Sequence, residues 1–248
     1  MNNFGGSSFQ VGQQIFDLTK KTLIMGILNV TPDSFSDGGD FSGIDAAYAH
    51  AMDMVDRGAD IIDIGGESTR PGADKVDLQT ELSRIIPIIE KIRKKSDIPI
   101  SVDTYKSVVA EKALAAGVDI VNDISGLNFD DNMVDVIVKH NASAVLMHIQ
   151  GTPENMQSNP TYENMIDEIL TYLSRAAGKL RDTGVNPAKI AIDPGIGFGK
   201  LWRKNYEILR YLKDFKSAGY PLLIGPSRKS FIGNLLELPV DERLEGTL

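Results

Sequence analysis

Gly58-Ala59-Asp60-Ile61-Ile62-Asp63 recurs further along the chain as Gly117-Val118-Asp119-Ile120-Val121-Asn122. In both stretches a glycine of the kind that ends a helix precedes a short apolar run, and the run ends on a polar side chain. Continuously apolar runs are typical of strands buried on both faces of a parallel sheet. Seven such runs are predicted to be strands: Leu23–Leu28, Ile61–Ile64, Ile98–Val102, Asp119–Ile124, Ala144–Ile149, Lys189–Ile192 and Pro221–Ile224.

Amphipathic stretches separate these runs. Apolar residues recur there at three- and four-residue spacing, over 44–55, 78–92, 165–180 and 208–215, which predicts helices with one buried face. Strands that alternate with helices indicate successive right-handed βα units in an α/β protein. An open doubly wound sheet and a (β/α)8 TIM barrel both fit this order. Polar residues follow every strand instead of clustering at one crossover, which favours the barrel.

The two ends of the chain add to this prediction. Phe9–Val11 and Ile15–Leu18 flank Gly12-Gln13-Gln14, so we expect a β-hairpin that caps the other end of the barrel. Seven strands are predicted before Leu248, whereas a closed barrel needs an eighth βα unit. We therefore expect a single domain over residues 1–248 that lacks the eighth βα unit at its C-terminus because the chain is truncated.

The composition excludes several classes of protein. The 248 residues include 26 Lys and Arg against 34 Asp and Glu, a net charge of −8, whereas sequence-independent nucleic-acid binding relies on basic patches. The absence of cysteine excludes disulfides, thiolate nucleophiles and cysteine-ligated metals. No stretch approaches the roughly 18 consecutive apolar residues of a membrane span. We expect no nucleic-acid partner, no membrane association and a cytoplasmic location.

Two glycine-rich loops follow the first two predicted strands, at 29–40 and 65–72. Their glycines and hydroxyl residues let backbone N–H groups approach anionic oxygens closely, and Arg70 can bind a phosphate through two parallel hydrogen bonds. The alternative is a pair of flexible surface turns. Two such loops on one rim of a barrel favour a ligand site.

Polar residues from three further strands form a second group. Asp103, Asn122 and Asp193 each end a strand, where the ordinary role of such residues is to cap the next helix. Three carboxylate or amide groups that converge from different strands are better suited to binding a planar heterocycle. Lys229 is expected to point toward the barrel mouth and Phe198 to wall a pocket, with a solvated turn and loop packing as the alternatives.

An ordered series of motifs extends over nearly the whole chain and resembles the dihydropteroate synthase family. The series consists of residues 28–39, 63–72, 101–104, 122–123, 147–148, 193–200 and 227–230. The resemblance implies a (β/α)8 barrel enzyme, a transferase of folate biosynthesis. Its reaction condenses 6-hydroxymethyl-7,8-dihydropterin pyrophosphate with p-aminobenzoate to give 7,8-dihydropteroate and pyrophosphate. It also implies Mg²⁺, small-molecule substrates, a homodimer and binding of sulfonamides in the p-aminobenzoate pocket.

The resemblance also assigns roles to residues. The pterin is expected to bind Asp103, Asn122, Met147, Asp193 and Lys229. The pyrophosphate is expected to face Thr69 and Arg70, and Asn29 to bind its Mg²⁺. Of these residues, Asp103, Arg70 and Lys229 are expected to be catalytic. The p-aminobenzoate pocket is expected at Phe35, Pro71, Phe198 and Ser230, beneath a closing first loop that contains Asp33, Ser34, Ser36 and Asp37.

One feature of the family is missing from this sequence. The eighth strand of the family ordinarily carries an Arg-x-His segment that binds pyrophosphate, and Arg243 lies in a helical context that does not match it. Two alternatives stay open beside the synthase. One is a pterin-binding methyltransferase that acts with a corrinoid protein, and the other is a non-catalytic pterin-binding paralogue.

Overall fold

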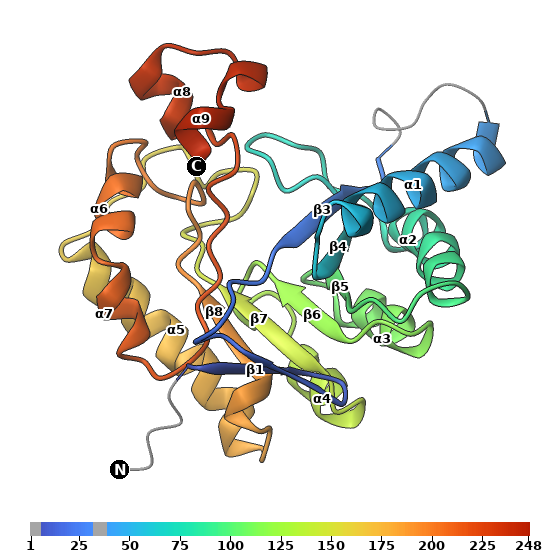
Figure 1. Ribbon diagram of the computed structural model, residues 1–248. Coiled ribbons are helices and arrows are strands. Elements are labelled where there is room, and N and C mark those ends of the chain that lie inside the picture. The colour runs from blue at the N-terminus through green and yellow to red at the C-terminus, as the bar shows by residue number, and fades with distance from the viewer. Residues whose placement is uncertain (1–5, 32–38) are drawn as a thin grey trace.

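A row of six parallel strands forms the centre of the molecule. The computed structural model describes residues 6–31 and 39–248, the side chains of 39–42 excepted. Each strand pairs with the next one along the chain, so the order in the sheet is the order in the sequence (Figure 1). The strands are β3 (Met25–Asn29), β4 (Ile61–Gly65), β5 (Ile100–Asp103), β6 (Ile120–Asp123), β7 (Ser143–Met147) and β8 (Ile190–Asp193). Sequential parallel pairing of βα units is the arrangement expected for a barrel wall.

The seventh predicted strand, 221–224, forms only an isolated bridge. Leu222 pairs in parallel with Ile192, and two backbone hydrogen bonds of 2.9 Å join Ile192 to Pro221 and Leu223. The segment therefore lies beside β8 as the next strand would, but its ladder is too short to count as one. The prediction of a seventh full strand was wrong in extent and right in place.

Helices follow the strands and cover the outer face of the row (Figure 1). The predicted helices 44–55, 78–92 and 165–180 are present, whereas 208–215 is divided because Tyr211, with φ −103° and ψ 22°, leaves the helical conformation. Isoleucines of the second helix, including Ile85 and Ile89, are fully buried in the main core with the strand residues Ile64 and Val102. The helices are α1 (Gly39–Asp56), α2 (Leu78–Arg93), α3 (Ser107–Ala115), α4 (Met133–Lys139), α5 (Met165–Asp182), α6 (Lys204–Arg210), α7 (Leu212–Lys216), α8 (Ser230–Leu236) and α9 (Leu244–Thr247), with short 3₁₀ helices η2 (Pro187–Lys189) and η3 (Val240–Glu242).

The repeated Gly-x-Asp-Ile design holds neighbouring strands in register. Asp60 accepts a hydrogen bond from the backbone N–H of Ile24, and Asp119 accepts one from that of Ile100, each at 2.9 Å. Arg93 also donates to Asp119 at 2.7 Å. Each aspartate thus attaches the start of its own strand to the start of a neighbouring strand that precedes it in the sequence.

The predicted amino-terminal hairpin is present and closes the end of the barrel opposite to the strand carboxyl ends. Strands β1 (Ser8–Val11) and β2 (Gln14–Asp17) are antiparallel, and Phe9 and Val11 are buried against residues that point into the barrel. These residues are Ile61, Ile120, Val145 and Ala191. The Ser143 hydroxyl donates to the Gln10 carbonyl at 2.7 Å, which attaches the hairpin to β7. Within the described ranges, no helix is long and apolar enough to span a membrane.

The hairpin offers a matched pair of substitutions. Phe9 is 4% exposed and Ile15, in the same hairpin, is 69% exposed. We expect Phe9→Ala to lower the free energy of unfolding by about 3 kcal/mol, because it opens a cavity in the floor of the barrel. Ile15→Ala should change it by less than about 0.5 kcal/mol. Urea unfolding followed by circular dichroism measures both, and equal effects would contradict the described packing.

Candidate functional site

The strand register brings four predicted site positions to one level. Asn29 is paired with Gly65, Gly65 with Asp103, and Asp103 with Asn122, along β3 to β6. Since the strands are parallel, these side chains lie at the same carboxyl-end rim. Met147 and Asp193 are paired in the same way at the ends of β7 and β8. The structure therefore gathers Asn29, Asp103, Asn122, Met147 and Asp193 at one end of the sheet.

Asp63 lies one level deeper and contacts this group. Its Oδ2 accepts a hydrogen bond of 3.0 Å from the Asn122 side-chain amide, and the residue is 4% exposed. Burial raises its pKa, against the opposing effect of hydrogen bonds. Asp63 is not among the site residues that the sequence patterns predict. The available signal was a carboxylate inside an otherwise apolar strand, since buried carboxylates are uncommon without a partner.

Two buried carboxylate oxygens point to a ligand. Within the part of the chain that the structure describes, Asp63 Oδ1 and Asp103 Oδ1 are buried without a hydrogen bond of standard geometry, although the Ser101 side chain lies close enough to Asp63 to lower its pKa. Burial, and next the negative charge of Asp63, raise the pKa of Asp103 well above its usual range. A buried polar atom without a partner is unfavourable, so donors from a bound molecule would stabilise both groups.

Gly65 leaves a small space between Asp103 and Asn29. A Cβ atom at this glycine would lie 3.6 Å from Asp103 Oδ2 and 3.8 Å from Asn29 Oδ1. The carboxylate oxygen and the amide oxygen therefore line the same space. Hard cations such as Mg²⁺ prefer oxygen ligands of these two kinds.

Asp193 and Lys229 lie within electrostatic reach of each other on the other side of the site. The Asp193 carboxylate accepts a hydrogen bond of 2.7 Å from the backbone N–H of Gly195, as expected for a residue that shapes a turn. Burial raises the pKa of Asp193 to about 6, although that hydrogen bond and the charge of Lys229 oppose the shift. Lys229 donates to the Ile196 carbonyl at 2.9 Å, and its ammonium lies 4.3 Å from the centroid of the Phe198 ring.

The loop that carries Phe198 is held against the end of β7. A Cβ atom at Gly195 would lie 2.0 Å from the His148 carbonyl oxygen, and its φ is +70°, so only glycine is accommodated. Lys200, which is 1% exposed, donates to the Phe198 carbonyl at 2.8 Å and lies 2.9 Å from His148 Nδ1. Burial and the neighbouring lysine lower the pKa of His148 to about 2, so its ring is neutral and fixed in structure.

The remaining predicted residues lie at the rim. Thr69 is partly buried, Arg70 and Pro71 are exposed in the loop after β4, and Ser230 is exposed as the first residue of α8. Within the described chain, the Arg70 guanidinium forms no ion pair. Predicted residues of the first loop lie outside the described residues: Asp33, Ser34, Phe35, Ser36 and Asp37.

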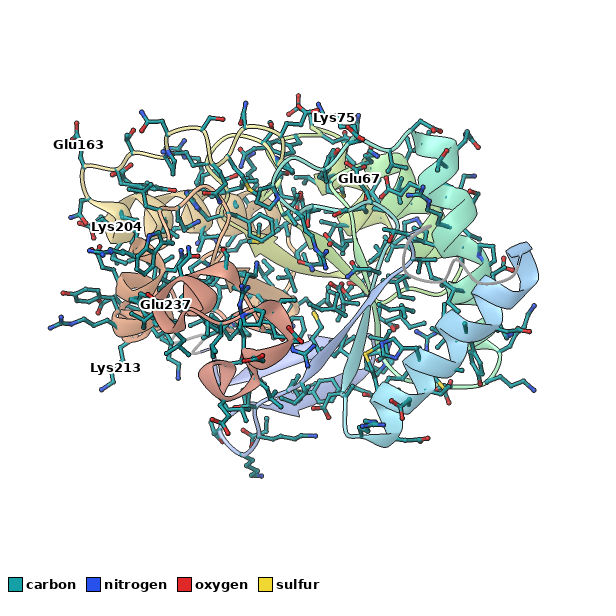
Figure 2. All side chains as sticks on the ribbon, turned by 90° about the horizontal axis from the view of Figure 1, so that it is seen from above. Glu67, Lys75, Glu163, Lys204, Lys213 and Glu237 are labelled. Carbon is teal, nitrogen blue, oxygen red and sulfur yellow. The ribbon has the colours of Figure 1, made fainter. Side chains whose placement is uncertain are left out.

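A separate surface groove of about 380 Å³ lies between residues 162–167 and the helices α6 and α7. Its lining includes Glu163 and Lys204, which lie on the same side of the molecule (Figure 2). No strand-end residue lines this groove. It is therefore distinct from the carboxyl-end site.

Comparisons with known proteins identify the family. A family model described as pterin binding enzyme matches residues 25–248. A curated dihydropteroate synthase of Synechocystis is 51% identical over 96% of this chain and 82% of its own length. The solved dihydropteroate synthase of Clostridium difficile, with pteroic acid, is 52% identical, with a TM-score of 0.88 over 94% of this chain and 86% of that one.

A third relative agrees with these two. The dihydropteroate synthase of Xanthomonas albilineans with 4-aminobenzoic acid is 37% identical, with a TM-score of 0.89 over 98% of this chain and 86% of that one. The similarity extends through the strands and their carboxyl-end loops, and it confirms the predicted barrel fold. The chain belongs to the dihydropteroate synthase family of pterin-binding enzymes.

Proposed function

We propose that the carboxyl-end site binds the pterin through Asp103, Asn122, Asp193 and Lys229, with Met147 against the ring. As a member of its family, the chain is a transferase of folate biosynthesis that joins a pterin pyrophosphate to p-aminobenzoate. The observation that carries the site assignment is that the buried Oδ1 of Asp103 and the buried carboxylate of Asp193 lie at the same carboxyl-end rim as the Asn122 amide. The relatives with pteroic acid and 4-aminobenzoic acid support it.

A pterin has the donors that these groups need. Its ring N–H and amino groups donate, and carboxylates accept, whereas an amide such as that of Asn122 supplies both a donor and an acceptor. Because the Asn122 amide nitrogen already donates to Asp63, the orientation of this amide is fixed before a ligand arrives. The site is therefore preorganised for one arrangement of donors and acceptors on the ring.

The chemistry requires charge stabilisation more than a strong base. The bond between the pterin methylene carbon and the pyrophosphate oxygen breaks, and the oxygen takes the electron pair. The aniline nitrogen of p-aminobenzoate then forms a bond to the methylene carbon and loses a proton. Arg70 stabilises the negative charge of the leaving group, and Asp103, in its ionised form, would offset the positive charge that develops on the pterin. No nucleophilic side chain is needed, in agreement with a chain that has no cysteine.

The oxygens of Asn29 and Asp103 beside Gly65 are of the kind that would suit Mg²⁺. Asn29 would hold it through its amide oxygen, beside the Asp103 carboxylate, and substrate oxygens and water would complete the shell that Mg²⁺ prefers. When bound, Mg²⁺ neutralises negative charge on the departing pyrophosphate. Thr69 and Arg70 contact the same anion from the loop after β4.

The p-aminobenzoate subsite is proposed beside the pterin. Phe198 would supply an aromatic wall, and its ring is held by Lys229 through a cation–π contact. Pro71 and Ser230 flank this wall from their two loops, and Phe35 is proposed to complete it. Closure of the first loop over the substrates, by the segment that contains residues 33–37, would exclude water from the reactive methylene.

A homodimer and a single domain over the whole chain also remain predictions.

One assay tests the function. The protein is incubated with pterin pyrophosphate, p-aminobenzoate and Mg²⁺, and dihydropteroate and released pyrophosphate are measured. Product formation that a sulfonamide inhibits supports the proposal. Pterin binding without turnover would favour a non-catalytic paralogue, and methyl transfer to a corrinoid protein would favour the methyltransferase.

Pterin affinity should depend on pH through Asp193. Its pKa of about 6 means that below that pH the carboxyl group is protonated, so it loses its negative charge and one of its two oxygens becomes a hydrogen-bond donor. We therefore expect calorimetric affinity to fall as the pH drops through about 6 in the wild type. Asp193→Asn should bind more weakly at pH 7.5 and lack this step.

The stability of the ligand-free protein should respond with the opposite sign. A folded-state pKa above the unfolded value means that the folded state binds the proton more tightly, so stability falls as the pH rises from about 4 to about 6. Asp193→Asn should remove this dependence and raise the melting temperature at pH 7.5. A variant that keeps both pH steps would contradict the role given to Asp193.

Arg70 should act on turnover. Arg70→Met removes the cation proposed to stabilise the departing pyrophosphate, so we expect kcat to fall about 100-fold. Affinity for 6-hydroxymethylpterin, which has no diphosphate, should stay within about twofold because Arg70 is at the rim. Arg57→Met is the matched control, since Arg57 is an exposed arginine whose pair with Asp53 lies on the surface. Unchanged kcat in Arg70→Met would contradict the assignment.

A further inference from the structure

A buried ion cluster lies beneath the loop that carries Thr69 and Arg70. The cluster consists of Glu67, Glu81, Tyr105 and Lys106. The Lys106 ammonium donates to Glu67 Oε2 at 2.5 Å and to Glu81 Oε2 at 2.6 Å. Tyr105 donates to the other oxygen of Glu67 at 2.8 Å. Glu67 is 8% exposed and Glu81 is 1% exposed, so these are interior charges with fixed partners.

Lys106 joins both ends of this loop. Besides Glu67, which precedes Thr69, it donates at 2.5 Å to the carbonyl oxygen of Val76, where the loop ends. One ammonium group thus joins Glu67 and Val76, which flank segment 68–75. We call these two flanking residues the neck of the loop. The ammonium group belongs to a different part of the chain, because Lys106 lies just before α3. Hydrogen bonds to charged groups are stronger than those between neutral groups, so the neck is the firm part of the loop.

The outer part of the loop has weaker contacts. The Gly72 N–H donates to the Pro153 carbonyl at 3.4 Å, and Lys75, next to the neck, forms an exposed ion pair with Glu154 at 3.2 Å. Figure 2, drawn from above, shows Glu67 inside the molecule and Lys75 at its rim. An exposed ion pair of this kind contributes little to holding a loop, because water and salt screen the two charges. The position of Arg70 therefore depends mainly on the neck, where the charged hydrogen bonds of Lys106 lie.

The charge of Lys106 also affects the site. The carboxylates of Glu81 and Glu67 contribute to the raised pKa of Asp103, after burial and the charge of Asp63, so all of these groups lie within electrostatic reach of one another. Burial acts to lower the pKa of Lys106, but its hydrogen bonds to Glu67 and Glu81 raise it, and the group stays charged. Its positive charge offsets two carboxylates that would otherwise repel a substrate anion approaching Arg70.

We propose that Lys106 is a positioning residue for the diphosphate end of the substrate, which it serves by joining Glu67 to Val76 and so placing Thr69 and Arg70. The inference rests on the proposed function, because Thr69 and Arg70 are assigned to the pyrophosphate there. Lys106 itself touches neither substrate nor reacting atoms.

The test compares two ligands. We expect Lys106→Met to weaken binding of the pterin pyrophosphate about tenfold or more, while binding of 6-hydroxymethylpterin stays within about twofold. Calorimetry measures both dissociation constants. A residue with a merely structural role would weaken both ligands alike. In the ligand-free protein, amide hydrogen exchange over residues 68–76 should become faster in the same variant.

Two further variants complete the design. Lys75→Met is the matched control in the same loop, and it should change both affinities less than about twofold. Lys106→Met leaves Glu81 buried without a partner and can prevent folding. Tyr105→Phe removes one neutral donor from Glu67, keeps every charge, and should weaken only the pyrophosphate ligand, by about threefold.

The outcomes separate the inference from the function on which it rests. Equal losses for both ligands, no loss in Lys106→Met and Tyr105→Phe, or the same loss in Lys75→Met would overturn the role of Lys106 alone. Failure of the wild-type protein to bind either ligand would overturn the proposed function and the inference with it. Selective loss of the pyrophosphate ligand, with faster exchange over 68–76, would support it.

Discussion

The site depends on buried carboxylates. The protein itself does not supply all the hydrogen bonds that their oxygens can accept. Asp63 and Asp103 each keep one buried oxygen without a hydrogen bond of standard geometry, and burial raises the pKa of Asp193 to about 6. A core packed only for stability would not contain such groups, because each lowers the stability of the free fold. The apolar strands and the hairpin beneath them supply the stability that lets these carboxylates be retained.

Around these carboxylates, close packing and hydrogen bonds hold the backbone of two loops in place. The loop after β8 lies so close to β7 that Gly195 has no room for a side chain, and Lys200 holds the Phe198 carbonyl from beneath. The loop after β4 is closed at its neck by Lys106. Both loops thus have firm bases and exposed outer residues, which suits a site that must admit substrates and still place its polar groups accurately.

Sequence patterns predicted the elements whose signal is local. Continuous apolar runs located the six strands, the polar residues after them located the rim, and the hairpin followed from two short runs around Gly12. The seventh run forms only a bridge at Leu222, because strand length depends on pairing that the run itself does not encode. The division of the predicted helix 208–215 at Tyr211 also has no local signal in the apolar spacing.

Contacts between distant charges were not predictable in this way. Lys106, Glu67 and Glu81 are separated in the sequence and resemble ordinary surface charges until the fold brings them together. Lys200 and His148 form a second example. Asp63 could have been found as a carboxylate within an apolar strand, but its contact with Asn122 required the register of three strands.

The repeated aspartates have a consequence for the order of assembly. The backbone groups that Asp60 and Asp119 bind, at Ile24 and Ile100, both precede them in the sequence. Each of these contacts needs only chain that has already been synthesised when its aspartate emerges from the ribosome. Alignment of β4 on β3, and of β6 on β5, is thus specified progressively from the amino terminus and does not wait for the last helices.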